Sequence, residues 1–278
     1  MIKAMGMGLV ILLALYIIAG VGLYFAQRHL IYYPQPFTQE RFPELTLETA
    51  DGLLTAICVN TDASCQPIGP RAIIYFGGNA EAVIHSASLL QRIIAPEISV
   101  YLVNYRGFGR SAGSPSEPAL IQDALAVYDH IHQQLQSTPT QSVSIQSGAA
   151  QPLTIDVIGR SIGTGVASAL ASQRSVRKLA LITPFDSLEA VAQEKFRLYP
   201  LRLLLKDSFC NDQRATQIDS QVLLLVAGQD EMIPPRHAER LKMAFNRPID
   251  YTTIDSATHN DIMTYSQAQE RLQQFMSD

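Results

Sequence analysis

Ser161 is the centre of the sequence Gly159-Arg160-Ser161-Ile162-Gly163, which follows the apolar run 153–158. The run predicts a buried strand, and the small residues of 162–171 predict a helix packed closely against it. Ser161 would then occupy the sharp corner between strand and helix, with its hydroxyl held at the edge of a sheet. We expect glycine on both sides because a Cβ would crowd the turn and because glycine adopts the required backbone angles without penalty. Ser161 is therefore a candidate nucleophile.

A serine nucleophile needs a base that accepts its proton, an acid that orients the base, and hydrogen-bond donors for the oxyanion. Asp230 and His259 each lie in a short segment that follows an apolar run, 228–231 and 256–261, so both would lie just beyond the end of a predicted strand. Asp186, after the preceding strand, is the second candidate for the acid. His237 falls inside a predicted helix and suits the base less well. The sequence thus predicts a catalytic group of Ser161, Asp230 and His259.

The oxyanion donors are expected to be two backbone N–H groups. One belongs to Ile162, directly after the nucleophile, and the other to the turn Gly77-Gly78-Asn79, which follows a predicted strand. Because glycine has no side chain, this turn can approach a substrate oxygen closely. We name Asn79 as the second donor and Gly78 as its alternative.

The rest of the chain alternates apolar runs with amphipathic segments, which predicts one mostly parallel sheet with helices and right-handed crossovers. Besides 153–158, strands are expected at 45–49, 53–59, 72–76, 98–103, 178–182, 221–227 and 249–254. Helices are expected at 80–94, 116–135, 162–171, 234–245 and 261–276. The first two strands flank Asp51-Gly52 and predict an antiparallel hairpin at the edge. The polar segment 137–152 predicts an exposed loop.

Residues 185–218 interrupt this alternation and suit a small cap over the site. Pro200 breaks a helical pattern there. Residues 195–206 include four basic and no acidic residues, namely Lys195, Arg197, Arg202 and Lys206, and the acids Asp207 and Asp212 follow them. These two acids and Asp219 are expected to be surface groups.

The N-terminal segment 4–26 contains no charged residue. As a helix it would be about 34 Å long, enough to cross a hydrocarbon core of about 30 Å. We therefore expect residues 1–27 to be a single-pass membrane anchor and residues 28–278 to be one further domain. A cleaved signal peptide is the alternative, with Gly20-Val21-Gly22 as a poor cleavage site. Flanking polar and aromatic residues are expected at the membrane interface: Tyr24, Arg28, His29, Tyr32 and Tyr33.

Composition excludes several classes of protein. A formal net charge of −4 without clusters of basic residues argues against a nucleic-acid partner. The three cysteines have no spacing typical of a zinc site, and nothing indicates a metal or cofactor. A disulfide between Cys58 and Cys65 is left open, since spacing alone does not establish the geometry.

The orientation of the anchor is less clearly marked, because the positive charges on its two sides nearly balance. We favour an extracytoplasmic catalytic domain.

Several short motifs follow one another along the chain after the N-terminal segment: Leu30-Ile31-Tyr32-Tyr33-Pro34, Gly78-Asn79-Ala80, Asn104-Tyr105-Arg106-Gly107-Phe108-Gly109, Ser114-Pro115-Ser116-Glu117, Gly159-Arg160-Ser161-Ile162-Gly163-Thr164, Thr183-Pro184-Phe185-Asp186-Ser187, Asp230, Ile233-Pro234 and His259-Asn260. On these motifs the chain, from about Arg28 onward, resembles the membrane-anchored α/β-hydrolase-domain serine hydrolases related to protein depalmitoylases and to lysophospholipid and monoacylglycerol lipases. In that fold the order along the chain is serine, acid, histidine, as it is here. The group usually has histidine where this chain has Gly77.

The resemblance implies an esterase or thioesterase with a small-molecule, lipid or acyl substrate and with Ser161, Asp230 and His259 as its triad. Two alternatives remain: a peptidase similar to prolyl aminopeptidases, and a non-catalytic scaffold of the same fold that binds a lipid or a protein. The peptidase usually carries a larger cap with acidic groups, whereas the segment 185–218 is short and its part 195–206 has four basic and no acidic residues. The sequence does not specify the acyl chain length or the oligomeric state.

Overall fold

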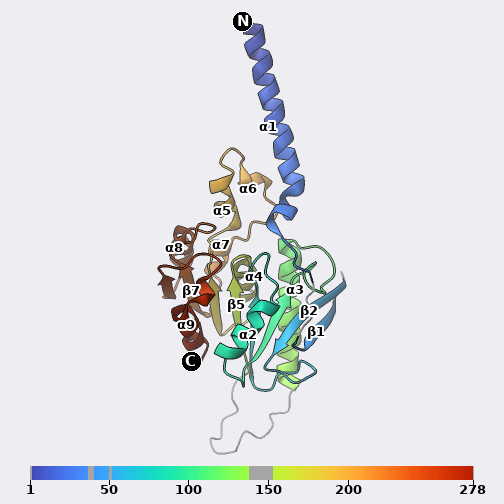
Figure 1. Ribbon diagram of the computed structural model, residues 1–278, viewed down its shortest axis with the longest axis vertical. Coiled ribbons are helices and arrows are strands. Elements are labelled where there is room, and N and C mark those ends of the chain that lie inside the picture. Colours follow the sequence, from blue (N-terminus) through green and yellow to red (C-terminus); the bar gives the residue numbers. More distant parts are fainter. Residues whose placement is uncertain (1, 37–40, 50–51, 138–152, 278) are drawn as a thin grey trace, which may run out of the picture.

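The computed structural model describes residues 2–36, 41–49, 52–137 and 153–277. They form an eight-stranded sheet in the order β1-β2-β4-β3-β5-β6-β7-β8 (Figure 1). The strands are β1 (Glu44–Thr49), β2 (Gly52–Val59), β3 (Arg71–Phe76), β4 (Ser99–Asn104), β5 (Thr154–Arg160), β6 (Lys178–Ile182), β7 (Gln221–Ala227) and β8 (Asp250–Ile254). From β4 to β8 all neighbours are parallel, while β1 and β2 are antiparallel to the strands beside them.

Helices cover both faces of the sheet, as the alternation in the sequence predicts. They are α2 (Ile84–Ile93), α3 (Glu117–Ser137), α4 (Ile162–Ala171), α8 (Pro235–Ala244) and α9 (Ser266–Ser277). Successive strand residues face opposite sides, so Ile73 belongs to the core cluster that contains residues of α2 and α9, and Ile74 belongs to the cluster that contains residues of α3, α4 and α8. The chain thus has the α/β-hydrolase fold: a mostly parallel sheet between two layers of helices.

One expectation about the sheet and one about a helix need adjustment. The strands β1 and β2 pair as an antiparallel ladder, but only β1 lies at the edge, because β2 also pairs with β4. The turn at Asp51 and most of the predicted loop 137–152 lie outside the described residues. The segment before α9 is a short 3₁₀ turn, Ile262–Thr264, where one longer helix was predicted.

The segment between β6 and β7 contains α5 (Leu188–Lys195), α6 (Leu201–Leu204) and α7 (Asn211–Ala215). In Figure 1, α5 and α6 rise above the sheet beside the N-terminal helix, whereas α7 packs against α4 and α8 in the main body. Asp207 is not the surface group that was predicted. Its carboxylate is fully buried, where it accepts hydrogen bonds from Arg28 at 3.0 and 3.3 Å and from the Glu117 N–H at 3.1 Å.

The N-terminal helix α1 (Ile2–Ile31) projects from the rest of the molecule (Figure 1). In the part of the chain that the structure describes, it is the one helix long and apolar enough to cross a membrane. Of the three tyrosines expected at a membrane interface, Tyr24 and Tyr33 are exposed, but Tyr32 is not. The Tyr32 ring is 4 % exposed and joins the hydrophobic core, so the prediction was wrong for this residue.

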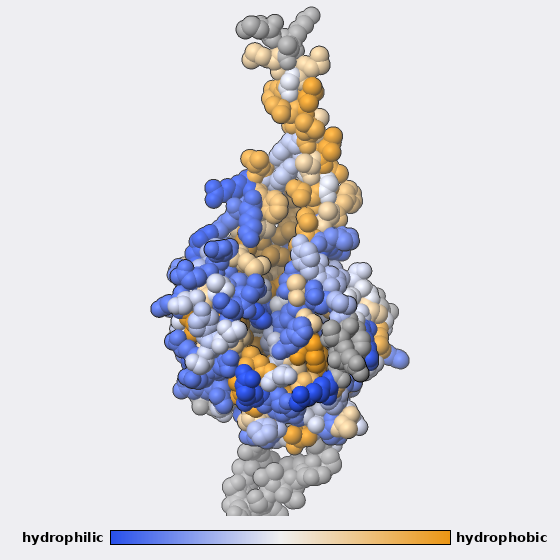
Figure 2. Space-filling model, in the orientation of Figure 1, coloured by the Kyte–Doolittle hydropathy of each residue, from blue (hydrophilic) through white to orange (hydrophobic). Residues whose placement is uncertain are grey.

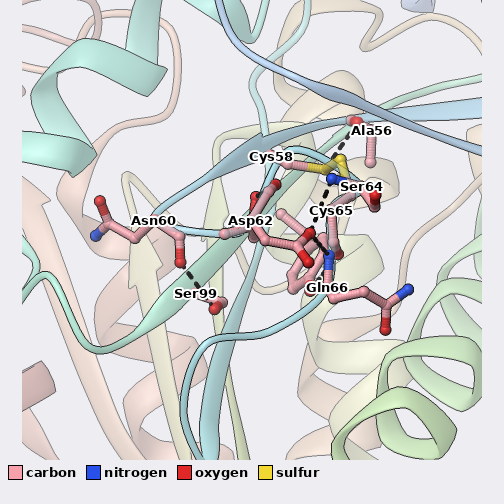
Figure 3. Close-up of a disulfide and its surroundings, with 10 residues drawn as sticks. Ala56, Cys58, Asn60, Asp62, Ser64, Cys65, Gln66 and Ser99 are labelled. Atoms are coloured by element: carbon pink, nitrogen blue, oxygen red, sulfur yellow. Dashed lines mark hydrogen bonds between the residues drawn. A yellow bond between two sulfur atoms is a disulfide. The ribbon is translucent and has the colours of Figure 1, made fainter. Parts of the chain in front are cut away.

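Cys58 and Cys65 form a disulfide between β2 and the following loop (Figure 3). The loop is held by further bonds: the Asp62 carboxylate accepts from the N–H groups of Ser64 and Gln66 at 2.8 Å, and the Ser99 hydroxyl donates to the Asn60 carbonyl at 2.9 Å. The structure thereby selects the bridge that the sequence had left open.

Candidate active site

Ser161 occupies the corner between β5 and α4. Its backbone adopts φ 51° and ψ −120°, a combination that costs free energy in a residue other than glycine. A Cβ built on Gly163 would lie 2.2 Å from the Phe76 carbonyl oxygen, and one on Gly159 would lie 2.5 Å from the Gly163 oxygen. The steric reason for both glycines is therefore confirmed. Neither glycine has a positive φ, however, and the unusual backbone angle belongs to Ser161 itself.

The structure brings together the three residues that the sequence selects. His259 Nε2 lies 2.9 Å from Ser161 Oγ, and His259 Nδ1 lies 2.7 Å from Asp230 Oδ2. The other carboxylate oxygen of Asp230 accepts the N–H groups of Met232 and Ile233 at 2.9 and 2.7 Å. His259 and Asp230 are both 6 % exposed, so the carboxylate orients the imidazole away from bulk water. This arrangement can deprotonate the serine hydroxyl as it attacks a carbonyl carbon.

Asp186, the alternative acid, belongs to a different cluster. Its Oδ1 lies 2.7 Å from Nδ1 of the fully buried His237, and its Oδ2 accepts from Arg240 at 3.1 Å. Burial alone would raise the pKa of Asp186, but the hydrogen bonds from His237 and the Ser187 N–H hold that pKa below its usual value. Asp186 and His237 therefore pair with each other, outside the Ser161 site.

The turn after β3 lies directly beside the nucleophile, since a Cβ on Gly78 would be 3.6 Å from the Ser161 Cβ. The Gly78 N–H donates to Glu81 Oε2 at 2.7 Å, so this N–H is already used and does not point to a substrate oxygen. The Asn79 side chain is bound to the end of α1: its Nδ2 donates to the Ile31 carbonyl at 2.6 Å and its Oδ1 accepts from the Tyr33 N–H at 2.9 Å. The geometry therefore favours the Asn79 N–H over that of Gly78 as a candidate oxyanion donor.

The sequence reasoning assigned no role to Glu81 or Arg160, yet both organise this turn. Besides Gly78, Glu81 accepts hydrogen bonds from Tyr75 at 2.8 Å and Ser86 at 2.5 Å, and it lies 3.5 Å from Arg160 Nη1. Arg160 also donates to the Asn260 carbonyl at 2.9 Å, next to His259. The signal in the sequence was their position: Glu81 directly follows the motif Gly78-Asn79-Ala80, and Arg160 directly precedes Ser161.

Ser161 and His259 lie at the base of a cavity of about 510 Å³, which extends upward between the cap and α1. Asn79 and Ile162 also line it, so the candidate oxyanion donors and the hydroxyl face one space. Within the described ranges, no group of three or more His, Cys, Asp or Glu side chains is placed to hold a metal ion.

A strained serine elbow at the end of a central parallel strand, followed in order by an acid and a histidine, defines the α/β-hydrolase class. The chain is 31 % identical over 244 residues to an uncharacterized protein of Mycobacterium tuberculosis, with 84 % of this chain and 81 % of that protein covered. It is 27 % identical over 217 residues to the human alpha/beta hydrolase domain-containing protein 17B, with 77 % and 68 % covered. To the Arabidopsis thaliana alpha/beta hydrolase domain-containing protein WAV2 it is 27 % identical, with 88 % and 85 % covered.

The chain therefore belongs to the alpha/beta hydrolase family, in the group of α/β-hydrolase-domain proteins to which these relatives belong. Solved structures share the fold at low sequence identity. The Pyrococcus furiosus esterase Pf2001 has a TM-score of 0.63 at 15 % identity, covering 89 % of this chain and 97 % of the esterase. The esterase domain of a Rhodothermus marinus protein has a TM-score of 0.58 at 16 % identity, covering 84 % and 95 %. No family model matches the chain.

Proposed function

We propose that this protein is a membrane-anchored serine hydrolase that cleaves acyl esters or thioesters through Ser161, His259 and Asp230. The observation that carries the proposal is the position of His259, hydrogen-bonded to Ser161 Oγ on one side and to Asp230 on the other. Among family members a histidine with both contacts is what makes a serine nucleophilic at neutral pH.

In the proposed reaction, Ser161 Oγ attacks the substrate carbonyl carbon while His259 Nε2 accepts the hydroxyl proton. The carboxylate of Asp230 stabilises the resulting imidazolium, and the N–H groups of Asn79 and Ile162 bind the oxyanion. His259 then donates the proton to the leaving alcohol or thiol, which leaves an acyl group on Ser161. Water, deprotonated by His259, attacks this acyl-enzyme and releases the carboxylic acid and the free serine.

An ester or thioester substrate is favoured over a peptide with a free amino terminus. Such a peptide carries a positive charge that an acidic group would have to bind. The described residues that line the cavity include no Asp or Glu, and the one Lys or Arg among them is Lys195.

The non-catalytic scaffold is the remaining alternative, and a fluorophosphonate probe separates it from the enzyme. We expect the full-length protein in detergent to be labelled at Ser161 and to hydrolyse p-nitrophenyl esters. Ser161→Ala should lose labelling and reduce turnover by about 10⁶-fold. A folded wild-type protein that neither reacts with the probe nor hydrolyses any ester would contradict the proposal.

We further propose that α1 is a single-pass anchor and that the catalytic domain lies outside the cytoplasm. The support for this orientation is the disulfide between Cys58 and Cys65, because disulfides persist mainly in oxidising compartments. Protease added to intact cells should digest the catalytic domain, whereas a cytoplasmic domain would be digested only after lysis.

A further inference from the structure

The cavity above Ser161 has α1 as one of its walls. Six residues of α1 face it, and they recur at helical spacing along one side of the helix: Gly20, Leu23, Tyr24, Gln27, Leu30 and Ile31. At 1.5 Å per residue, the wall from Gly20 to Ile31 is about 16 Å long. The catalytic site therefore continues into a space that the hydrolase domain does not enclose by itself.

The opposite wall comes from the cap and is apolar apart from Lys195. Its residues include Leu188, Val191, Ala192, Phe196, Leu201 and Leu204. Figure 2 shows hydrophobic side chains on both sides of the hollow between the cap and α1, above a largely hydrophilic hydrolase domain. A long, narrow space with apolar walls and a nucleophile at one end has the form of a binding site for a hydrocarbon chain.

Specific contacts hold the cap against α1 at both ends of the cavity. At the upper end the rings of Tyr16 and Tyr199 stack at 4.7 Å, and the Tyr16 hydroxyl donates to the Leu198 carbonyl at 2.6 Å. At the lower end Gln27 donates to the Leu204 carbonyl at 3.2 Å and accepts from the Lys206 N–H at 2.7 Å. Between these two pairs of contacts, the side chains on the facing walls are apolar apart from Lys195.

The upper contacts fall within the stretch of α1 that would span the bilayer. A span of about 20 residues that begins at Met5 reaches Tyr24, so Tyr16 and Gly20 lie inside it. The cap residues at that level are also suited to lipid: Leu198 is 79 % exposed and Leu203 is 80 % exposed. The basic residues beside them, Arg197 and Arg202, are of the kind that lie at lipid headgroups.

We propose that α1 forms half of an acyl-chain site and that the chain of a bilayer-resident long-chain ester or thioester enters laterally, between α1 and the cap. The ester carbonyl would then reach Ser161 while the distal methylenes stay against Leu23 and Ala192. This proposal rests on the proposed function, and it adds that the membrane helix selects the substrate. A lipid ester and an S-acylated protein share this chemistry.

The test compares two substitutions on α1. Leu23→Trp fills the cavity, whereas Val21→Trp places the same side chain on a lipid-facing position that does not line it. Full-length variants in phospholipid vesicles are assayed with C4 and C12 p-nitrophenyl esters, with active sites counted by fluorophosphonate labelling. Each buried methylene can contribute up to about fourfold, or about 0.8 kcal/mol, so the wild-type kcat/KM should be at least tenfold higher for C12 than for C4.

Leu23→Trp should lower the C12-to-C4 ratio at least tenfold, and Val21→Trp should leave it unchanged. Ala192→Phe, on the opposite wall, is the second blocking variant if Leu23→Trp does not fold. Monoacylglycerol and an S-acylated peptide, assayed in the same vesicles, show which source of acyl chain is accepted. Equal rates for C4 and C12, or equal ratios for the Leu23 and Val21 variants, would overturn the acyl-chain site and leave the hydrolase intact. If the folded wild-type protein shows neither labelling nor any ester turnover, both proposals are overturned.

Discussion

Asn79 connects two parts of the molecule that are 46 residues or more apart in sequence, since its side chain bridges Ile31 and Tyr33 at the end of α1. Its backbone N–H is at the same time the candidate oxyanion donor beside Ser161. Preorganised donors are effective because they need no reorganisation when charge develops on the substrate oxygen. The two hydrogen bonds of the Asn79 side chain therefore help to fix the orientation of its backbone N–H.

We predict that Asn79→Ala lowers kcat for short-chain esters by about 10- to 100-fold, with a much smaller change in KM. The reason is that the methyl group makes neither bond to α1 and the turn loses its fixed position. Steady-state kinetics together with the rate of fluorophosphonate labelling measure the effect. An unchanged thermal midpoint would exclude general unfolding, and a change in KM alone would argue against the preorganisation of the turn.

At the scale of elements, the cluster around Asp186 fastens the cap helix α5 to α8. His237 lies between Asp186 on one side and Glu194 of α5 on the other, 3.3 Å from Glu194 Oε1. Arg236 of α8 also pairs with Glu194, and its hydrogen bond lowers the pKa of Glu194 to about 2. Both carboxylates are thus ionised at neutral pH, and their charges hold the base of the cap in place.

We predict that Asp186→Asn lowers the free energy of unfolding by about 2 to 3 kcal/mol at pH 7, because it removes the charged acceptor that the buried His237, the Ser187 N–H and Arg240 contact. The native pKa of Asp186 lies below its unfolded value of about 3.9. Its contribution is therefore fully present above pH 4 and is lost as the pH falls through the native pKa. Denaturant unfolding at several pH values should show the difference between variant and wild type shrinking in acid.

A matched control is Asp219→Asn, whose carboxylate pairs with Arg247 but has a side chain that is 96 % exposed. This exposed pair should contribute less than about 1 kcal/mol. If the two variants were equally destabilised, or if the Asp186 difference grew at low pH, the assignment of Asp186 as a buried structural anion would be wrong.

At the scale of the whole molecule, the disulfide stabilises the end of the sheet that lies away from α1. The bridge closes a short loop across a sequence separation of 7, and the Tyr101 hydroxyl donates to the Cys65 carbonyl at 2.9 Å. The bridge is not near Ser161, so it should affect stability and leave the chemistry unchanged.

We predict that the double variant Cys58→Ser, Cys65→Ser has a free energy of unfolding about 2 kcal/mol lower than that of wild type, from the lost restriction of the unfolded chain. Reduction of the wild type with dithiothreitol should have the same effect, and the kcat of the folded fraction should not change. Cys210→Ser, at the one free cysteine, is the control and should alter stability by less than about 0.5 kcal/mol. Equal stability of the oxidised and reduced wild type would contradict a structural role for the bridge.

The sequence alone was sufficient for the features that depend on local pattern. The apolar runs predicted strands at β3 to β8, and the Gly-x-Ser-x-Gly motif predicted the elbow at Ser161. The order serine, acid, histidine, with each acid or base after a strand, selected the three residues that the structure places in contact. These signals are local because hydrophobic periodicity and turn chemistry act over a few residues.

Only the tertiary structure decided which residues meet across long separations. The sequence predicted Asp207 to be a surface group of the cap. In the structure it is buried and pairs with Arg28, which is 179 residues away in the sequence. Tyr32 looked like an interfacial anchor, yet it packs into the core because α1 ends against the sheet domain. The wall that α1 adds above Ser161 likewise joins residues 20–31 to the cap. Such contacts depend on the packing of complete elements, and no pattern within a short window of sequence specifies them.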